Sequence, residues 1–199
     1  MSAIFIAEHI SLEGVMQAPG RADEDTRGGF RGGGWATAGA NGQVTSALAD
    51  RVGQAGGMRL LLGRRSYDDM LSYWNAQGGP FAEGLNAAPK YVVSRQTGTP
   101  LPWPNSTPIT GDVVDAIRAL KREPGPELCV MGSGELVDTL LRRRLAEELL
   151  LFIHPLLLGS GRRLFPAEGA APLAVERLSS AATETGVVIA RYRVRDVAP

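Results

Sequence analysis

An apolar stretch that ends in a glycine–serine–glycine turn carries the clearest indication of chemistry in this sequence. Residues 128–131 are apolar, Gly132, Ser133 and Gly134 follow, and a helical pattern begins directly after them. A strand that leads into a helix through such a turn leaves the first backbone N–H groups of the helix open, and these donors favour an anion such as phosphate. Glycine also serves tight turns that bind nothing, so this turn alone leaves both interpretations open.

Two other short apolar stretches, 60–62 and 91–93, are followed by arginines. Each junction lies at the carboxyl end of a predicted strand, which is the edge where open α/β sheets bind ligands. Arginine forms charge-assisted, often bidentate bonds to phosphate, so the three junctions together suit a dinucleotide, and NADP with its additional 2′-phosphate better than NAD. The alternative is that these arginines are ordinary solvated surface charges. The residues concerned are Gly63, Arg64, Arg65, Ser66, Ser94 and Arg95.

The elements that position these junctions alternate in the first two thirds of the chain. This alternation of strands and helices predicts a largely parallel sheet with helices on both faces, in a single three-layer α/β domain over residues 1–199. The last third has strands without helices, which predicts an antiparallel hairpin at one edge. We expect strands at 3–10, 59–63, 91–93, 127–131, 149–158, 175–180 and 187–194, helices at 44–55, 64–74, 113–120 and 136–141, a break at 78–80, and a proline-rich loop at 99–108.

A long glycine-rich segment over residues 11–41 interrupts this alternation. It contains eight glycines and shows no sustained helical or strand period. Loops of this length inside a compact domain are usually functional or disordered. The glycines suggest mobility, whereas Phe30 and Trp35 suggest that the segment is tethered, as a lid would be. Gln17, Trp35 and Tyr67 are candidates to line a substrate pocket, with packing or loop anchoring as the alternative.

His154 lies in the most apolar stretch of the chain, residues 149–158. We interpret this stretch as a strand bent at Pro155, where a ladder N–H is missing. His154 is either a core histidine or a residue that faces the substrate and donates a proton. The stretch is too short to span a bilayer.

Composition excludes several classes of protein. The chain of 199 residues has 21 Lys and Arg against 21 Asp and Glu, and a zero net charge argues against a nucleic-acid-binding surface. One cysteine and two histidines make a metal site improbable. The standard Rossmann fingerprint, the P-loop and the serine hydrolase elbow are absent. Because the N-terminus lacks the basic region of a signal peptide, we expect a soluble, cytoplasmic protein.

Five segments in this order and spacing resemble the dihydrofolate reductase-like superfamily, and within it the reductase domain of riboflavin biosynthesis. They are residues 11–16, 62–67, 93–95, 132–136, and 155–161 leading to 164–165. The resemblance implies an NADPH-dependent reductase that transfers hydride to a small heterocyclic or carbonyl/imine substrate, similar to 5-amino-6-(5-phosphoribosylamino)uracil reductase. It also implies that a homodimer is possible. The hydride would come from the cofactor, while the protein orients the reactants.

The resemblance also implies which residues bind the cofactor. Gly63, Arg64, Arg65, Ser66, Ser94 and Arg95 would hold the adenosine phosphates; Gly132, Ser133, Gly134, Glu135 and Leu136 would hold the pyrophosphate; and Gly14, Val15 and Met16 would lie near the nicotinamide. Two features depart from the family. Glu13 stands where the family usually has Asp, and the first helix has no acid before Asp50, so dihydrofolate reductase activity is not expected. A non-catalytic nucleotide-binding or structural dimer module of the same fold is therefore the alternative.

Overall fold

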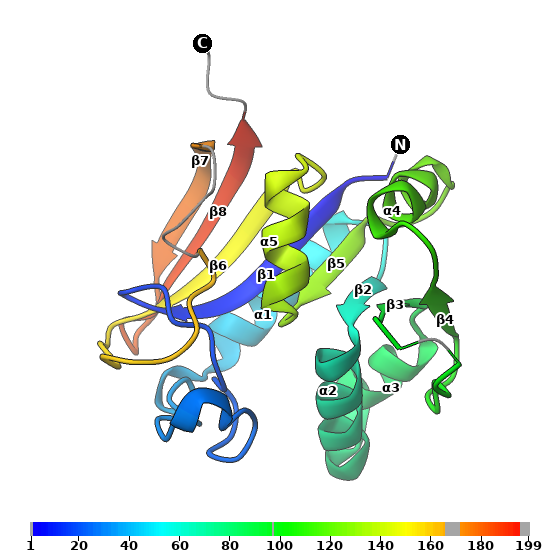
Figure 1. Cartoon of the computed structure of the whole chain (residues 1–199). Coiled ribbons are helices and arrows are strands. Elements are labelled where there is room, and N and C mark those ends of the chain that lie inside the picture. The colour runs from blue at the N-terminus through cyan, green and yellow to red at the C-terminus, as the bar shows by residue number, and fades with distance from the viewer. Residues whose placement is uncertain (1, 97, 166–171, 196–199) are drawn as a thin grey trace. The chain divides into compact units, whose positions relative to one another are not determined.

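The computed structural model describes residues 2–96, 98–165 and 172–195 (Figure 1). Within these residues, eight strands form one sheet in the order β4-β3-β2-β5-β1-β6-β8-β7. The strands are β1 (Ile4–Ser11), β2 (Arg59–Gly63), β3 (Lys90–Val93), β4 (Ser106–Ile109), β5 (Leu128–Met131), β6 (Glu148–His154), β7 (Ala174–Ala182) and β8 (Val188–Arg195). The helices are α1 (Gly42–Gln54), α2 (Arg64–Gln77), α3 (Gly79–Ala87), α4 (Val113–Arg122) and α5 (Gly134–Arg142), with short 3₁₀ turns η1 (Arg27–Gly29) and η2 (Thr37–Gly39).

The chain divides into two compact units. The first unit comprises Met1–Phe5 and Arg51–Leu145, and the second comprises Ile6–Asp50 and Ala146–Pro199. The expectation of a single domain over residues 1–199 stays a prediction. No helix in the described part of the chain is long and apolar enough to cross a membrane.

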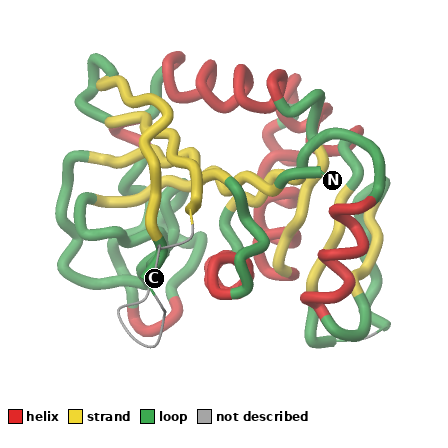
Figure 2. Tube along the Cα trace, turned by 90° about the horizontal axis from the view of Figure 1, so that it is seen from above, coloured by secondary structure: helices red, strands yellow, loops and turns green. Residues whose placement is uncertain are grey.

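The first unit contains the parallel strands. Leu61 of β2 is aligned with Tyr91 of β3, and Leu60 with Cys129 of β5. Leu60, Leu61 and Leu62 have no exposed surface, as is typical of a parallel strand covered on both faces. Helices lie on both sides of the strands in Figure 2. These features confirm the predicted mostly parallel α/β sheet.

The second unit contains the antiparallel strands and the glycine-rich loop. Strand β8 pairs antiparallel with both β6 and β7. The predicted C-terminal hairpin, β7 and β8, is therefore confirmed. The predicted strand over 149–158 is wrong in its second half, because β6 ends at His154, directly before Pro155. Proline cannot donate a ladder hydrogen bond, so it ends the strand here rather than bending it.

Two elements of the first unit were missed by the sequence patterns. Gly78, with φ 72°, ends α2, and α3 begins at the next residue with Pro80 in its first turn. Proline is tolerated there because the first helical N–H groups need no partner within the helix. The predicted loop over 99–108 ends in β4, which pairs parallel with β3. Pro108 is accommodated because β4 is an edge strand.

Candidate functional site

Two of the predicted phosphate-binding junctions are joined by reciprocal hydrogen bonds in the first unit. The backbone N–H of Gly63 donates to Ser133 Oγ at 2.9 Å, and the backbone N–H of Ser133 donates to Ser66 Oγ at 2.8 Å. Because β2 and β5 are parallel neighbours, the helices that follow them both begin at the same sheet edge. The structure therefore brings Gly63, Ser66 and Ser133 together, 67 to 70 residues apart in sequence.

The helices α2 and α5 both begin without a side-chain cap. Gly63 precedes α2 and has no side chain to offer, and Ser133 precedes α5 in a left-handed conformation with φ 61° and ψ 40°. The Ser133 hydroxyl donates to the Met131 carbonyl at 3.3 Å and accepts from Gly63, so it does not cap its own helix. Two adjacent helix N-termini without side-chain caps offer backbone N–H donors and the positive end of the helix dipole to an anion.

Gly132 is a position at which the turn requires glycine. Its φ is 63°, and a Cβ built there would lie 2.8 Å from Ser66 Oγ, closer than side chains approach one another. The close approach of the two turns therefore depends on the missing side chain. Gly134 and Leu136 continue from this turn into the first turn of α5.

The arginines at this edge are paired with carboxylates or exposed. Arg64 Nε donates to Asp68 Oδ2 at 2.7 Å, and Arg95 forms an ion pair with Glu135. This second pair joins the junction after β3 to the junction after β5, with both side chains well exposed. Arg65 is exposed and forms no ion pair with another described residue. Ser94 accepts a hydrogen bond from Gln96 N at 3.0 Å, which fixes the turn after β3.

The residues predicted near the nicotinamide form a tight turn in the second unit. Gly14 has φ 83°, Val15 N donates to Ser11 Oγ at 3.1 Å, and Met16 N donates to the Arg162 carbonyl at 2.9 Å. Glu13 Oε1 accepts from Leu158 N at 2.6 Å and Gly159 N at 2.8 Å, which ties this turn to the segment after β6. The expected contact of Gly14, Val15 and Met16 with nicotinamide stays a prediction.

His154 lies in a buried cluster of aromatic rings in the second unit. Its Nε2 is 2.9 Å from His9 Nδ1, and Trp35 meets its ring edge-on with 5.2 Å between centroids. His9 also stacks on Phe152, with 4.7 Å between ring centroids. Burial, with the neighbouring His154 as a second cause, lowers the pKa of His9 to about 4, and burial also lowers the pKa of His154. His154 is almost fully buried, which favours the core interpretation over that of a proton donor.

The other candidate substrate residues have structural partners. Gln17 is 4% exposed and its amide bonds backbone groups of the loop, while Trp35 Nε1 donates to the Gln17 carbonyl at 2.7 Å. Tyr67 belongs to the first unit, has no exposed surface, and its hydroxyl accepts from Trp103 N at 3.0 Å. These contacts are packing and loop-anchoring contacts, and the role of Gln17, Trp35 and Tyr67 in a substrate pocket stays a prediction. No local pattern pointed to His9 as the partner of His154, because the two residues lie 145 positions apart.

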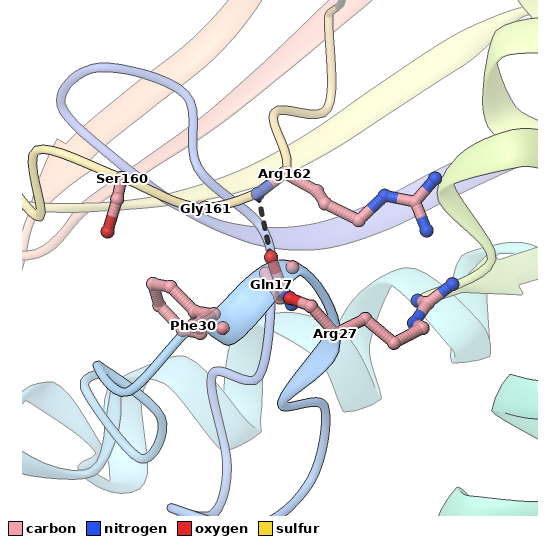
Figure 3. A pocket seen from close by; sticks show the side chains of 8 residues that line it. Gln17, Arg27, Phe30, Ser160, Gly161 and Arg162 are labelled. Carbon is pink, nitrogen blue, oxygen red and sulfur yellow. Dashed lines mark hydrogen bonds between the residues drawn. The ribbon is translucent and has the colours of Figure 1, made fainter.

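A pocket of about 470 Å³ lies in the second unit (Figure 3). Sequence patterns did not indicate this pocket, since only Gln17 among its lining residues was a candidate site residue. The signal that could have found it is an arginine next to a glycine-rich turn, which occurs as Arg27 before Gly28 and Gly29 and as Arg162 after Gly161. Its lining residues are Gln17, Arg27, Gly28, Gly29, Phe30, Ser160, Gly161 and Arg162. Within the described residues, no group of three or more His, Cys, Asp or Glu side chains is placed to hold a metal ion.

The whole fold and these junctions match one protein family. The model of the RibD C-terminal domain matches residues 3–189, so the chain belongs to this family. Among curated proteins, the uncharacterized protein YyaP of Bacillus subtilis (strain 168) is 30% identical over 112 residues. That match covers 53% of this chain and 58% of YyaP, so it spans little more than half of either protein.

Solved structures show the same fold at low sequence identity. A protein assigned to riboflavin biosynthesis from Shewanella sp. PV-4 superposes with a TM-score of 0.67 at 22% identity, covering 98% of this chain and 99% of that one. A pyrimidine reductase-like protein of Corynebacterium diphtheriae gives 0.63 at 12% identity, covering 98% and 93%. Dihydrofolate reductase of Enterococcus faecalis, complexed with NADP(H), gives 0.60 at 12% identity, covering 96% and 94%. The fold is therefore dihydrofolate reductase-like.

Proposed function

We propose that this protein is an NADPH-dependent reductase that transfers hydride to a small heterocyclic or carbonyl/imine substrate. The observation that carries the proposal is the pair of helix N-termini without side-chain caps, joined through Gly63, Ser66 and Ser133. Membership in the RibD C-terminal domain family and the fold shared with an NADP(H)-complexed reductase support it. A substrate similar to 5-amino-6-(5-phosphoribosylamino)uracil is the one that the family resemblance favours.

The residues of the first unit fit the phosphate groups of the cofactor. The backbone donors at the start of α5 suit the pyrophosphate, and the missing side chain of Gly132 lets the two turns lie close together. Arg95, whose side chain is 89% exposed, suits the 2′-phosphate, with Arg64, Arg65, Ser66 and Ser94 beside the same strand ends. When bound, NADPH supplies the hydride, and the chain supplies binding and orientation.

A non-catalytic module of the same fold is the second candidate. It is favoured by α1, which has no acidic residue in its first turn, and by the burial of His154. Neither the first turn of α1 nor the buried His154 therefore offers a proton donor for the substrate. Oxidation of NADPH, measured as loss of absorbance at the reduced nicotinamide band with pterin, imine and aminopyrimidine substrates, would exclude this candidate.

Cofactor affinity tests the proposed function directly. We expect NADPH to bind more tightly than NADH in a fluorescence titration, because only NADPH carries the 2′-phosphate. Arg95→Ala should lower the affinity for NADPH about tenfold and the affinity for NADH much less, since one charge-assisted contact to the 2′-phosphate is removed. Arg118→Ala is the matched control, because Arg118 is also an exposed arginine in an ion pair, with Asp115. Absence of any NADPH binding by the wild-type protein would overturn the proposal.

A further inference from the structure

The pocket of the second unit is lined by hydrogen-bond donors and by no carboxylate. Arg27 and Arg162 contribute guanidinium groups, and Ser160 contributes a hydroxyl. Phe30 and the glycines supply the remaining walls. A cavity with positive donors and no negative acceptor in its lining complements an oxyanion, since guanidinium binds carboxylate and phosphate through charge-assisted bonds.

Gln17 links the two arginine-bearing segments. Its Nε2 donates to the Arg27 carbonyl at 2.9 Å, and its Oε1 accepts from Arg162 N at 2.9 Å. The second of these bonds is drawn in Figure 3. Because Gln17 is buried, these bonds are shielded from water and hold the backbones of both arginines in place. Gln17 and Arg162, which are 145 positions apart in the chain, are thus joined at one cavity.

The arginine side chains extend toward the same side of the pocket (Figure 3). Arg27 is oriented by a two-point contact with Asp25, in which Nε donates to Oδ1 at 2.7 Å and Nη2 donates to Oδ2. Asp25 is not among the lining residues, so it orients the guanidinium from outside the cavity. An anion between the two side chains would meet the guanidinium of Arg162 and would share that of Arg27 with Asp25.

Backbone donors of the turn after β6 add to this arrangement. Gly159 N is engaged by Glu13, and Arg162 N by Gln17. The N–H groups of Ser160 and Gly161, which lie between them, make no hydrogen bond to any other residue that the structure describes. These two amides are available to a ligand, as in other glycine-rich turns that bind anions.

We propose that this pocket binds the oxyanion group, carboxylate or phosphate, of a small ligand through Arg27 and Arg162. Gln17 acts as a positioning residue for both. The site lies wholly within the second unit and does not depend on the cofactor contacts assigned to the first. It therefore predicts an anion selectivity that the proposed cofactor site does not explain.

An NMR titration of ¹⁵N-labelled protein tests the site with sodium phosphate and sodium succinate, against sodium chloride at equal ionic strength. We expect saturable shifts of the Gly28, Gly29 and Gly161 amides with one of the two oxyanions. Arg162→Gln should weaken this binding at least tenfold, as expected for loss of one charge-assisted contact of about 1.4 kcal/mol or more. Arg163→Gln is the matched control, because Arg163 is exposed and does not line the pocket, and it should change the affinity less than twofold.

The outcomes distinguish the ligand and the two proposals. Tighter binding of phosphate or of succinate identifies which oxyanion the site prefers. The proposed site would be rejected if the amide shifts with both oxyanions were no larger than those with chloride. It would also be rejected if Arg162→Gln and Arg163→Gln lost equal affinity. Gln17→Leu should weaken oxyanion binding as much as Arg162→Gln does. If Gln17→Leu does not fold, the result for Arg162→Gln alone tests the site. NADPH affinity should be unchanged in Arg162→Gln, so failure here leaves the cofactor proposal standing.

Discussion

At the scale of residues, Arg95 and Glu135 form an ion pair within the proposed cofactor site. They come from the ends of two different strands and pair at an exposed edge, where an ion pair contributes little to stability. The pair therefore has a small structural role. A phosphate that approaches Arg95 must compete with Glu135 for the guanidinium group, because it has either to displace the carboxylate or to share the arginine with it.

Glu135→Gln removes this competing charge. We expect NADPH affinity to rise roughly threefold to tenfold at low salt, since the repulsion between Glu135 and a phosphate is lost, and NADH affinity to rise less. Fluorescence titration measures both. Asp115→Asn, in the exposed Arg118–Asp115 pair, serves as the control and should change neither. Equal changes for the two cofactors would show that Arg95 does not meet the 2′-phosphate.

The His9–His154 pair predicts a pH dependence of stability. The unfolded chain binds a proton on His9 near pH 6.5, whereas the folded protein binds it only near pH 4. Stability should be fully present above pH 6.5 and fall by up to about 3 kcal/mol as the pH drops to 4, because the unfolded state takes up the proton first. Urea unfolding across this range measures the loss, and His9→Gln should flatten it. Parallel profiles for the two proteins would contradict the assignment.

At the scale of elements, the decisive feature is that two strand-to-helix turns are joined to each other. Each Ser hydroxyl accepts from the backbone of the other turn, so neither caps its own helix. Because of this arrangement, two helix N-termini have no side-chain cap. Their backbone N–H groups therefore lie as donors at one edge of the sheet. Such a turn pair is stable only while the backbones can approach closely, which Gly132 permits.

Gly132→Ala tests this arrangement. Alanine at φ 63° is strained by about 1 kcal/mol, and its Cβ would displace Ser66 Oγ, so we expect a total loss of about 1–3 kcal/mol in unfolding free energy. The affinities for NADPH and NADH should fall equally, because both cofactors carry the pyrophosphate. Gly53→Ala is the control, since Gly53 lies in α1 with open space around it, and it should stabilise by up to about 1 kcal/mol. Unequal losses for the two cofactors would argue against a pyrophosphate site here.

At the scale of the whole molecule, the chain has the mostly parallel α/β sheet of the RibD C-terminal domain family, and the proposed function makes NADPH its ligand. Binding to the folded state alone stabilises it by mass action. NADPH at about a hundred times its dissociation constant should add about 2.7 kcal/mol and raise Tm by roughly 5–10 °C for a chain of this length. Differential scanning calorimetry checks this, with NADH at the same concentration giving a smaller shift. A homodimer stays a prediction, which sedimentation would test.

The sequence predicted most elements because their signals are local. The apolar runs at 59–63 and 128–131, and the helical spacing of residues 113–120, depend only on near neighbours. It missed α3 and β4 because proline was interpreted as a break in both places. A helix's first turn and an edge strand both tolerate proline, but the sequence does not show which strand lies at an edge.

By itself, the sequence determined the fold class, since periodicity and turn residues fix it, and it predicted three strand ends at which an anion could bind. Only the tertiary structure decided which polar groups meet. It joined Gly63 and Ser66 to Ser133, buried His154 against His9, and placed the amide of Gln17 between the backbones of two arginines. These contacts join residues far apart in the chain, and the side-chain directions that create them depend on packing, which no local pattern encodes.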